Sequence, residues 1–130
     1  MTDSTITLGD FGVLTFKGDH WDGQDLKAGN HCVDLQVDSA SAPPKETVDL
    51  ISSILARSDE LIEAATRYLS LKAPDDVNNS GGLIEPSYLL DEDQMDSRFT
   101  LFFSASVPDI ETCYGVEFRS FSPFDLTIGD

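Results

Sequence analysis

The chain has 130 residues, of which 40% are hydrophobic, so it can bury a core of ordinary size and is predicted to form one domain over residues 1–130. Its 24 acidic residues outnumber its 8 basic residues and leave a formal net charge of −16. A field of this sign repels nucleic acid and anionic membrane surfaces and attracts basic proteins.

Two further expectations concern location and redox state. No apolar run approaches the roughly 20 residues that span a membrane. The first residues, MTDSTITLGD, have neither the basic start nor the apolar stretch of a secretory signal. We therefore expect a cytoplasmic protein. In that compartment Cys32 and Cys113 are more often two free thiols than a disulfide.

Short strands are predicted on both sides of the middle of the chain. The pattern of apolar residues indicates strands over 5–8, 11–17, 31–38, 98–106, 114–121 and 125–128. The alternation is clearest in 31–38, where Val33, Leu35 and Val37 share one face and the polar residues share the other. One face is therefore buried and the other wet, as in an antiparallel sheet with a helix on one side.

The only long helical pattern lies within residues 43–72. Apolar residues recur there at three- and four-residue steps, and Ser58 falls in the same row. A continuous helix from Pro44 to Leu71 measures roughly 42 Å at about 1.5 Å per residue, whereas a compact chain of this size is roughly 36 Å across. The helix therefore either overhangs the sheet or breaks at residues 57–59, where Ser58 has the chemistry of an internal N-cap.

Pro74 is expected to end this helix. Residues 74–82 then read as a flexible polar connection, and residues 83–90 as a short helical turn. The whole order predicts an α+β fold: an antiparallel sheet of about five or six strands with one long helix, straight or kinked, packed across one face.

Few residues offer catalytic or metal chemistry. His31 and Cys32 are neighbours on a strand and point to opposite faces, so they do not form a nucleophile pair. The two Cys and two His residues match no zinc spacing. The acidic run 91–96 lacks the glycine of a calcium-binding loop, although loose calcium binding stays open. The sequence thus predicts no catalytic residue, no metal and no cofactor.

Partner contacts are better supported by the residue types. Trp21 either closes the end of the sheet or anchors a partner, since Trp is enriched in binding hot spots. Phe102 and Phe121 have the parity opposite to the core rows, so they either pack under the acidic run or form a contact patch. The candidate partner-binding residues are Trp21, Asp91, Glu92, Asp93 and Asp96.

Several segments together resemble a known group of proteins. A first hairpin, the turn Trp21-Asp22-Gly23 and an alternating strand precede the amphipathic helix with Tyr68 near its end, and a late strand carries Gly115-Val116-Glu117-Phe118. The pattern resembles the small acidic bacterial domains of unknown function found among immunity proteins of toxin–immunity systems. The resemblance covers most of the chain except residues 74–82 and the acidic run. Those domains have no established active site to carry over to this chain, and their partner-binding surface varies among members.

The resulting hypothesis is a non-enzymatic acidic protein, monomeric or homodimeric, that neutralises a basic toxin domain such as a nuclease by occlusion. The alternatives are an acidic nucleic-acid mimic of the phage type and a small accessory protein. A small enzyme or metal-dependent protein is a weaker alternative.

Overall fold

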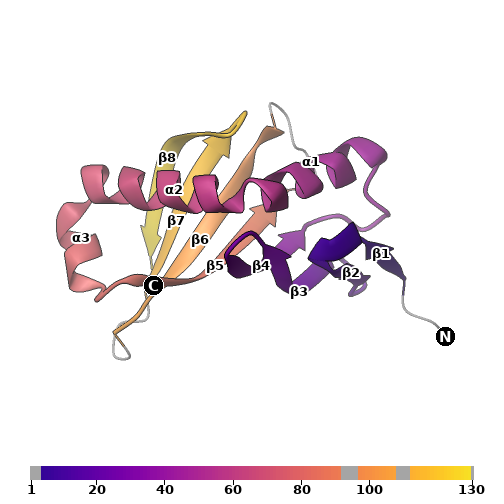
Figure 1. Ribbon diagram of the computed structural model, residues 1–130, viewed down its shortest axis with the longest axis horizontal. Helices are drawn as coiled ribbons and strands as arrows, with labels where there is room; N and C mark the ends of the chain where they lie inside the picture. The colour runs from indigo at the N-terminus through magenta and orange to yellow at the C-terminus, as the bar shows by residue number, and fades with distance from the viewer. Residues whose placement is uncertain (1–3, 92–96, 108–111, 130) are drawn as a thin grey trace.

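The computed structural model describes residues 4–91, 97–107 and 112–129, and in it eight strands form one sheet in the order of the chain (Figure 1). The strands are β1 (Thr5–Thr7), β2 (Val13–Phe16), β3 (Trp21–Ala28), β4 (His31–Val37), β5 (Leu83–Leu90), β6 (Phe99–Ala105), β7 (Cys113–Arg119) and β8 (Ser122–Gly129). The helices are the 3-10 turn η1 (Gly9–Phe11) and the α-helices α1 (Lys45–Ala56), α2 (Ser58–Lys72) and α3 (Pro74–Asn79).

The sheet consists of two antiparallel halves, β1–β4 and β5–β8, joined by the parallel pair β4–β5. We call this pair the seam. It contains four residue pairs, from Asp34 opposite Ser87 to Val37 opposite Leu90. Because parallel strands need a crossover connection, the helices α1 to α3 carry the chain from β4 to β5. The helices α1 and α2 lie across one face of the sheet, and α3 lies to one side of it (Figure 1).

The break that we considered at residues 57–59 is confirmed. Arg57 has φ −108° and ψ 15°, which separates α1 from α2, and Ser58 is fully buried at the start of α2. Further along, Pro74 occupies the first position of α3, and Ala73, at φ −140° and ψ 61°, lies outside helical geometry and ends α2.

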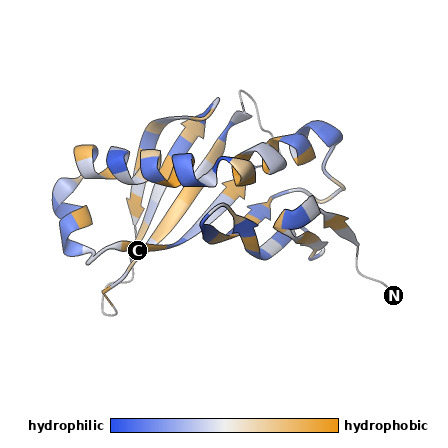
Figure 2. Ribbon diagram, viewed as in Figure 1, coloured by the Kyte–Doolittle hydropathy of each residue, from blue (hydrophilic) through white to orange (hydrophobic). Residues whose placement is uncertain are grey.

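The core lies between the helices and the inner face of the sheet. Strand and helix ribbons alternate between apolar and polar residues, as expected of elements with one buried side (Figure 2). One row of paired inner residues runs through Leu35, Tyr88, Leu101 and Val116, each at most 1% exposed. The helices supply the opposing layer, including the fully buried residues Ile51, Ile54, Leu55, Ala65 and Leu69.

The predicted fold is wrong in its architecture. The sheet has eight strands instead of five or six, it is mixed instead of antiparallel, and the single long helix is divided into shorter helices. The two strands missing from the prediction are β3 and β5. Each contains a bulge, with Asp25 at φ 52° and Glu85 at φ 56°, so the two-residue alternation that identifies a strand is interrupted.

Two local predictions fail for related reasons. Residues 83–90, expected as a short helical turn, form β5. Pro86 lies in the bulge between Ile84 and Ser87, where the strand register shifts and no ladder hydrogen bond is lost. Residues 74–79, expected as a flexible connection, form α3, which is attached to the sheet through the Tyr114 hydroxyl that donates to the Asp76 carbonyl at 3.3 Å. None of the described helices has the length and apolar content needed to cross a bilayer.

Candidate binding surface

The sheet face opposite the helices is the candidate functional surface, and we call it the open face. In the described part of the chain no α-helix lies on it, because α1 and α2 cover the other side and α3 lies to one side of the sheet (Figure 1). The strand register places one row of side chains across all eight strands of this face: Thr5, Thr15, Asp22, Gln36, Leu89, Thr100, Glu117 and Asp125.

A depression of about 350 Å³ lies on the open face over the seam. Four strands contribute to it, since its lining residues are Asp22, Asp34, Leu35, Gln36, Asp38, Ser87, Tyr88, Leu89 and Phe102. Leu35 and Tyr88 are core residues whose side chains are buried. The side chains accessible from the depression are therefore those of the other lining residues, which point outward from the sheet.

Three carboxylates surround the depression, and each accepts a hydrogen bond from a neutral donor. The Asp25 backbone N–H donates to Oδ1 of Asp34 at 3.0 Å, and the Gln36 side-chain amide donates to Oδ1 of Asp38 at 2.7 Å. The Gln24 amide donates to Asp22 at 3.2 Å. Among the described residues no Lys, Arg or His forms an ion pair with these carboxylates. Their negative charge is therefore left uncompensated within that part of the protein.

The other side of the depression is apolar. Leu89 lies next to Gln36 across the seam, and Phe102 is the partner of Ser87 on β5. The Phe102 ring extends over the backbone of Gly115 on β7, where an added Cβ would lie 2.9 Å from Cε1 of the ring. Glycine at this position lets the aromatic ring lie close to the sheet, and Phe102 remains half-buried at the border of the depression.

One corner of the open face carries cations. The guanidinium carbons of Arg98 and Arg119 lie 5.2 and 4.8 Å from the centre of the Phe124 ring. This arrangement is typical of cation–π contacts. The open face is thus polar in both signs, with the carboxylates at β3 and β4 and the two arginines toward β6 and β7.

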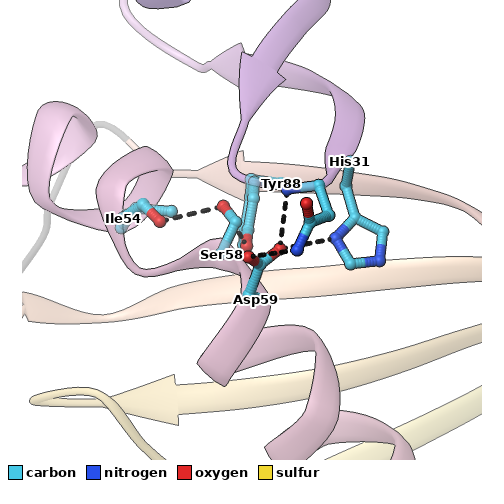
Figure 3. Close-up of polar contacts among 6 residues, drawn as sticks. His31, Ile54, Ser58, Asp59 and Tyr88 are labelled. Carbon is cyan, nitrogen blue, oxygen red and sulfur yellow. Dashed lines mark hydrogen bonds and ion pairs between the residues drawn. The ribbon is translucent and has the colours of Figure 1, made fainter.

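A polar cluster joins the two halves of the sheet on the inner side of the seam (Figure 3). The Tyr88 hydroxyl on β5 donates to Oγ of Ser58 at 2.9 Å, and Ser58 donates to the Ile54 carbonyl at 2.9 Å. In the next residue, Asp59, carboxylate oxygen Oδ1 lies 2.9 Å from Nδ1 of His31 on β4. The junction of α1 and α2 is therefore bonded to both halves of the sheet.

Asp59 also binds the turn between β3 and β4. Its two carboxylate oxygens accept the backbone N–H and the side-chain amide of Asn30, at 3.0 and 3.1 Å. Gly29 has φ +66°, and an added Cβ there would lie 2.6 Å from the Asp59 carboxylate. A side chain at this position would strain the backbone and push the carboxylate away from the turn, so glycine favours the contact.

The Ser, His and Asp side chains of this cluster do not form a hydrolytic triad. Ser58 is fully buried and donates its proton to a backbone carbonyl, whereas His31 contacts Asp59 instead of the serine. Burial raises the pKa of Tyr88 to about 12, so its phenol stays neutral at physiological pH. The hydrogen bonds of the cluster connect the α1–α2 junction to β4 and β5.

The contacts of Asp59 predict a dependence of stability on pH. The Asn30 backbone N–H, followed by the His31 hydrogen bond, holds the Asp59 pKa below its ordinary value of 3.8. The folded state therefore favours the ionised carboxylate. This stabilisation is complete above the unfolded pKa and is lost as the pH falls through the lower folded pKa.

Urea unfolding of the wild type and of Asp59→Asn at a series of pH values measures this effect. The difference in free energy of unfolding should be constant near neutral pH and should shrink below about pH 4. Asp49→Asn, at an exposed aspartate of α1, corrects for the change in net charge. A difference that stays constant down to the acid limit would contradict the assignment.

The predicted contact residues are placed differently from one another. Trp21 is 4% exposed, its indole N–H donates to the Ser41 carbonyl at 3.1 Å, and its ring packs on Phe16. Trp21 is therefore a core residue, in line with the first of its two predicted roles, and it does not contribute to the binding surface. Asp91 is exposed just after β5. Glu92, Asp93 and Asp96 lie outside the described residues, as does most of the stretch considered for calcium.

The remaining candidates for chemistry are also located. Cys32 and Cys113 are free and exposed, as expected for two thiols. Within residues 4–91, 97–107 and 112–129, no three His, Cys, Asp or Glu side chains come together in a way that could hold a metal ion.

The depression was missed as a site because its residues come from four strands. The outward side of β4, with Asp34, Gln36 and Asp38, was visible in the sequence as the polar half of an alternation. The neighbours Asp22 and Ser87 were not, since they lie on the two strands with bulges. The one available signal was Phe102, an aromatic residue with outward parity on a well-predicted strand.

The chain matches no protein-family model, no curated protein and no solved structure.

Proposed function

We propose that this protein is a non-enzymatic acidic binding protein whose open face docks a basic protein partner. The observation that carries the proposal is the depression over the seam, where Asp22, Asp34 and Asp38 lie beside apolar Leu89 and Phe102 without a compensating cation from the described residues. Uncompensated charge next to apolar surface is what a partner with basic and apolar contact residues would complement.

The two features contribute to different steps of binding. The net charge of −16 accelerates the encounter with a basic protein over long distances. Exposed charges at the rim change the association rate more than the residence time, so tight binding also needs an anchor that excludes water. The depression, with Leu89 and Phe102, offers a place for such an anchor.

The partner that we propose is a basic toxin domain, such as a nuclease, which this protein neutralises in the cytoplasm by occluding its surface. The sequence resemblance to immunity proteins supports this choice, and so does the excess of acidic over basic residues, which favours a basic partner. In this mechanism the protein covers the toxin's own anion-binding surface and performs no chemistry.

The test compares two triple variants with the same change in net charge. Asp22→Asn/Asp34→Asn/Asp38→Asn neutralises the depression, and Asp49→Asn/Asp75→Asn/Asp76→Asn neutralises exposed positions of α1 and α3. A basic partner is isolated from the source cell at moderate salt with the wild-type protein, and the dissociation constants are then measured. We expect the first variant to bind about a hundredfold more weakly and the second within about fivefold of wild type.

Inhibition of the partner is the second readout. The wild type should suppress its toxic or nucleolytic activity, and the depression variant should require a correspondingly higher concentration. Equal weakening by both triple variants would show that the charge acts only as a general field, and the proposal would then be wrong.

A further inference from the structure

We infer that the depression over the seam receives a single arginine side chain of the partner, an inference that rests on the proposed function. The depression joins an acidic side on β3 and β4 to an apolar side on β5 and β6. A side chain that fits it therefore needs a long apolar stem and a cationic head, which restricts the choice to arginine and lysine.

The strand register defines the path of that side chain. Asp34 is directly opposite Ser87, and Ser87 is directly opposite Phe102, so the three residues form one row over three adjacent strands. Neighbouring strands are about 4.8 Å apart, so this row spans roughly 10 Å. Ser87 is the smallest of the three, and it leaves room between the carboxylate and the ring for an extended stem.

The acidic end suits a guanidinium. Oδ1 of Asp34 accepts the Asp25 N–H, and in the described part of the chain its other oxygen accepts no hydrogen bond. Asp22 faces the same depression from β3, opposite Gln36. A planar guanidinium presents five donors, so it can satisfy a carboxylate in the bidentate manner while it reaches a second acceptor.

The apolar end favours arginine over lysine. Guanidinium is more weakly hydrated than ammonium and stacks on aromatic rings and apolar surface. It therefore loses less hydration free energy on entering a half-buried site next to Leu89 and Phe102. Lysine would place a compact, strongly hydrated charge in the same position. Charge complementarity alone admits both residues, and the shape of the site selects between them.

The probe is N-acetylarginine methylamide, titrated into the wild-type protein at low salt and followed by NMR of the backbone amides. Saturable shifts are expected at Asp34, Gln36, Ser87 and Leu89. The lysine analogue should bind about tenfold more weakly, and the neutral citrulline analogue, which keeps the shape without the charge, should give no saturable shift.

Matched variants locate the site. Asp34→Asn should weaken binding of the arginine probe about tenfold, whereas Asp49→Asn on α1 should change it by less than about twofold. The inference is overturned if the lysine probe binds as well as arginine, if the shifts spread over the acidic surface instead of the depression, or if no saturable shift develops at tens of millimolar probe.

The outcome separates this inference from the proposed function. If a basic partner is lost on neutralising the depression but the arginine probe does not bind, the docking surface stands and the arginine assignment is wrong. If the probe binds in the depression but binding of the basic partner does not depend on it, the proposed function is wrong. With a partner in hand, one Arg→Lys substitution in that partner should reproduce the loss caused by Asp34→Asn.

Discussion

Phe99→Ala should lower the free energy of unfolding by about 3–5 kcal/mol, a large part of the 5–15 kcal/mol typical of a domain. Phe99 is 3% exposed and lies at the centre of an aromatic group. Its ring stacks on that of Phe118 with the ring centres 5.0 Å apart. It meets the rings of Tyr88 and Phe121 edge-on, with ring centres 5.8 and 5.9 Å away. Truncation leaves a cavity that none of these rings fills.

The measurement is urea unfolding followed by the fluorescence of Trp21, the only tryptophan, which is buried in the core. Phe124→Ala is the matched control, because Phe124 is 37% exposed and contacts two arginine side chains. We expect the control to cost at most about 1 kcal/mol. Equal losses from both substitutions would contradict the assignment of Phe99 to the core.

Ser58→Ala is expected to cost about 1–3 kcal/mol, although it removes only one hydroxyl. The Tyr88 phenol is 1% exposed and donates to Ser58, so the substitution leaves a buried donor without a partner. Tyr88→Phe removes that donor itself, while Ser58 keeps its bond to the Ile54 carbonyl. This second change should therefore cost less, about 0.5–1.5 kcal/mol.

A double-mutant cycle tests the contact directly. The double variant should be no less stable than Ser58→Ala alone, which corresponds to a coupling of about 1 kcal/mol between the two side chains. Ser53→Ala, at an exposed position of α1, serves as the control and should be neutral or slightly stabilising because alanine favours helix. Additive losses in the cycle would show that the two hydroxyls do not interact.

The seam links these stability effects to the proposed function. Its inner side carries the bonds of Ser58 and Asp59 to the two halves of the sheet, and its outer side carries the depression. Tyr88 belongs to both, since its hydroxyl is in the cluster and the residue borders the depression. A change in the inner cluster should therefore be judged first by stability, and by binding only at temperatures where the variant is fully folded.

Ser58 shows how far sequence reasoning could go. A serine in an apolar helical row marked an unusual position, and its acidic neighbours marked the end of one helix and the start of another. The break follows from those local signals. The partner of the hydroxyl, Tyr88, is 30 residues away in the chain, and no pattern in the sequence indicated that pair.

Asp34 shows the opposite case. Its outward orientation was predicted by the alternation of β4. Its place in the depression depends on Ser87 and Phe102, which lie in the same row only because β4 pairs with β5. The bulges at Asp25 and Glu85 concealed the two strands on either side of β4. The acidic partner-binding residues were predicted in the run 91–96 because its charges are close together in the sequence, whereas the carboxylates of the depression are further apart in the chain.

By itself the sequence determined the features that depend on near neighbours: the ends of the helices at Pro44 and Pro74, the inward and outward sides of β4 and β6, and the net charge. These follow from backbone restriction and side-chain periodicity, which act within a few residues. Only the tertiary structure decided that β4 and β5 pair in parallel and bring Asp34 beside Ser87. Strand pairing depends on the burial of a whole sheet face against the helices, and that free energy belongs to the assembled fold and not to any one segment.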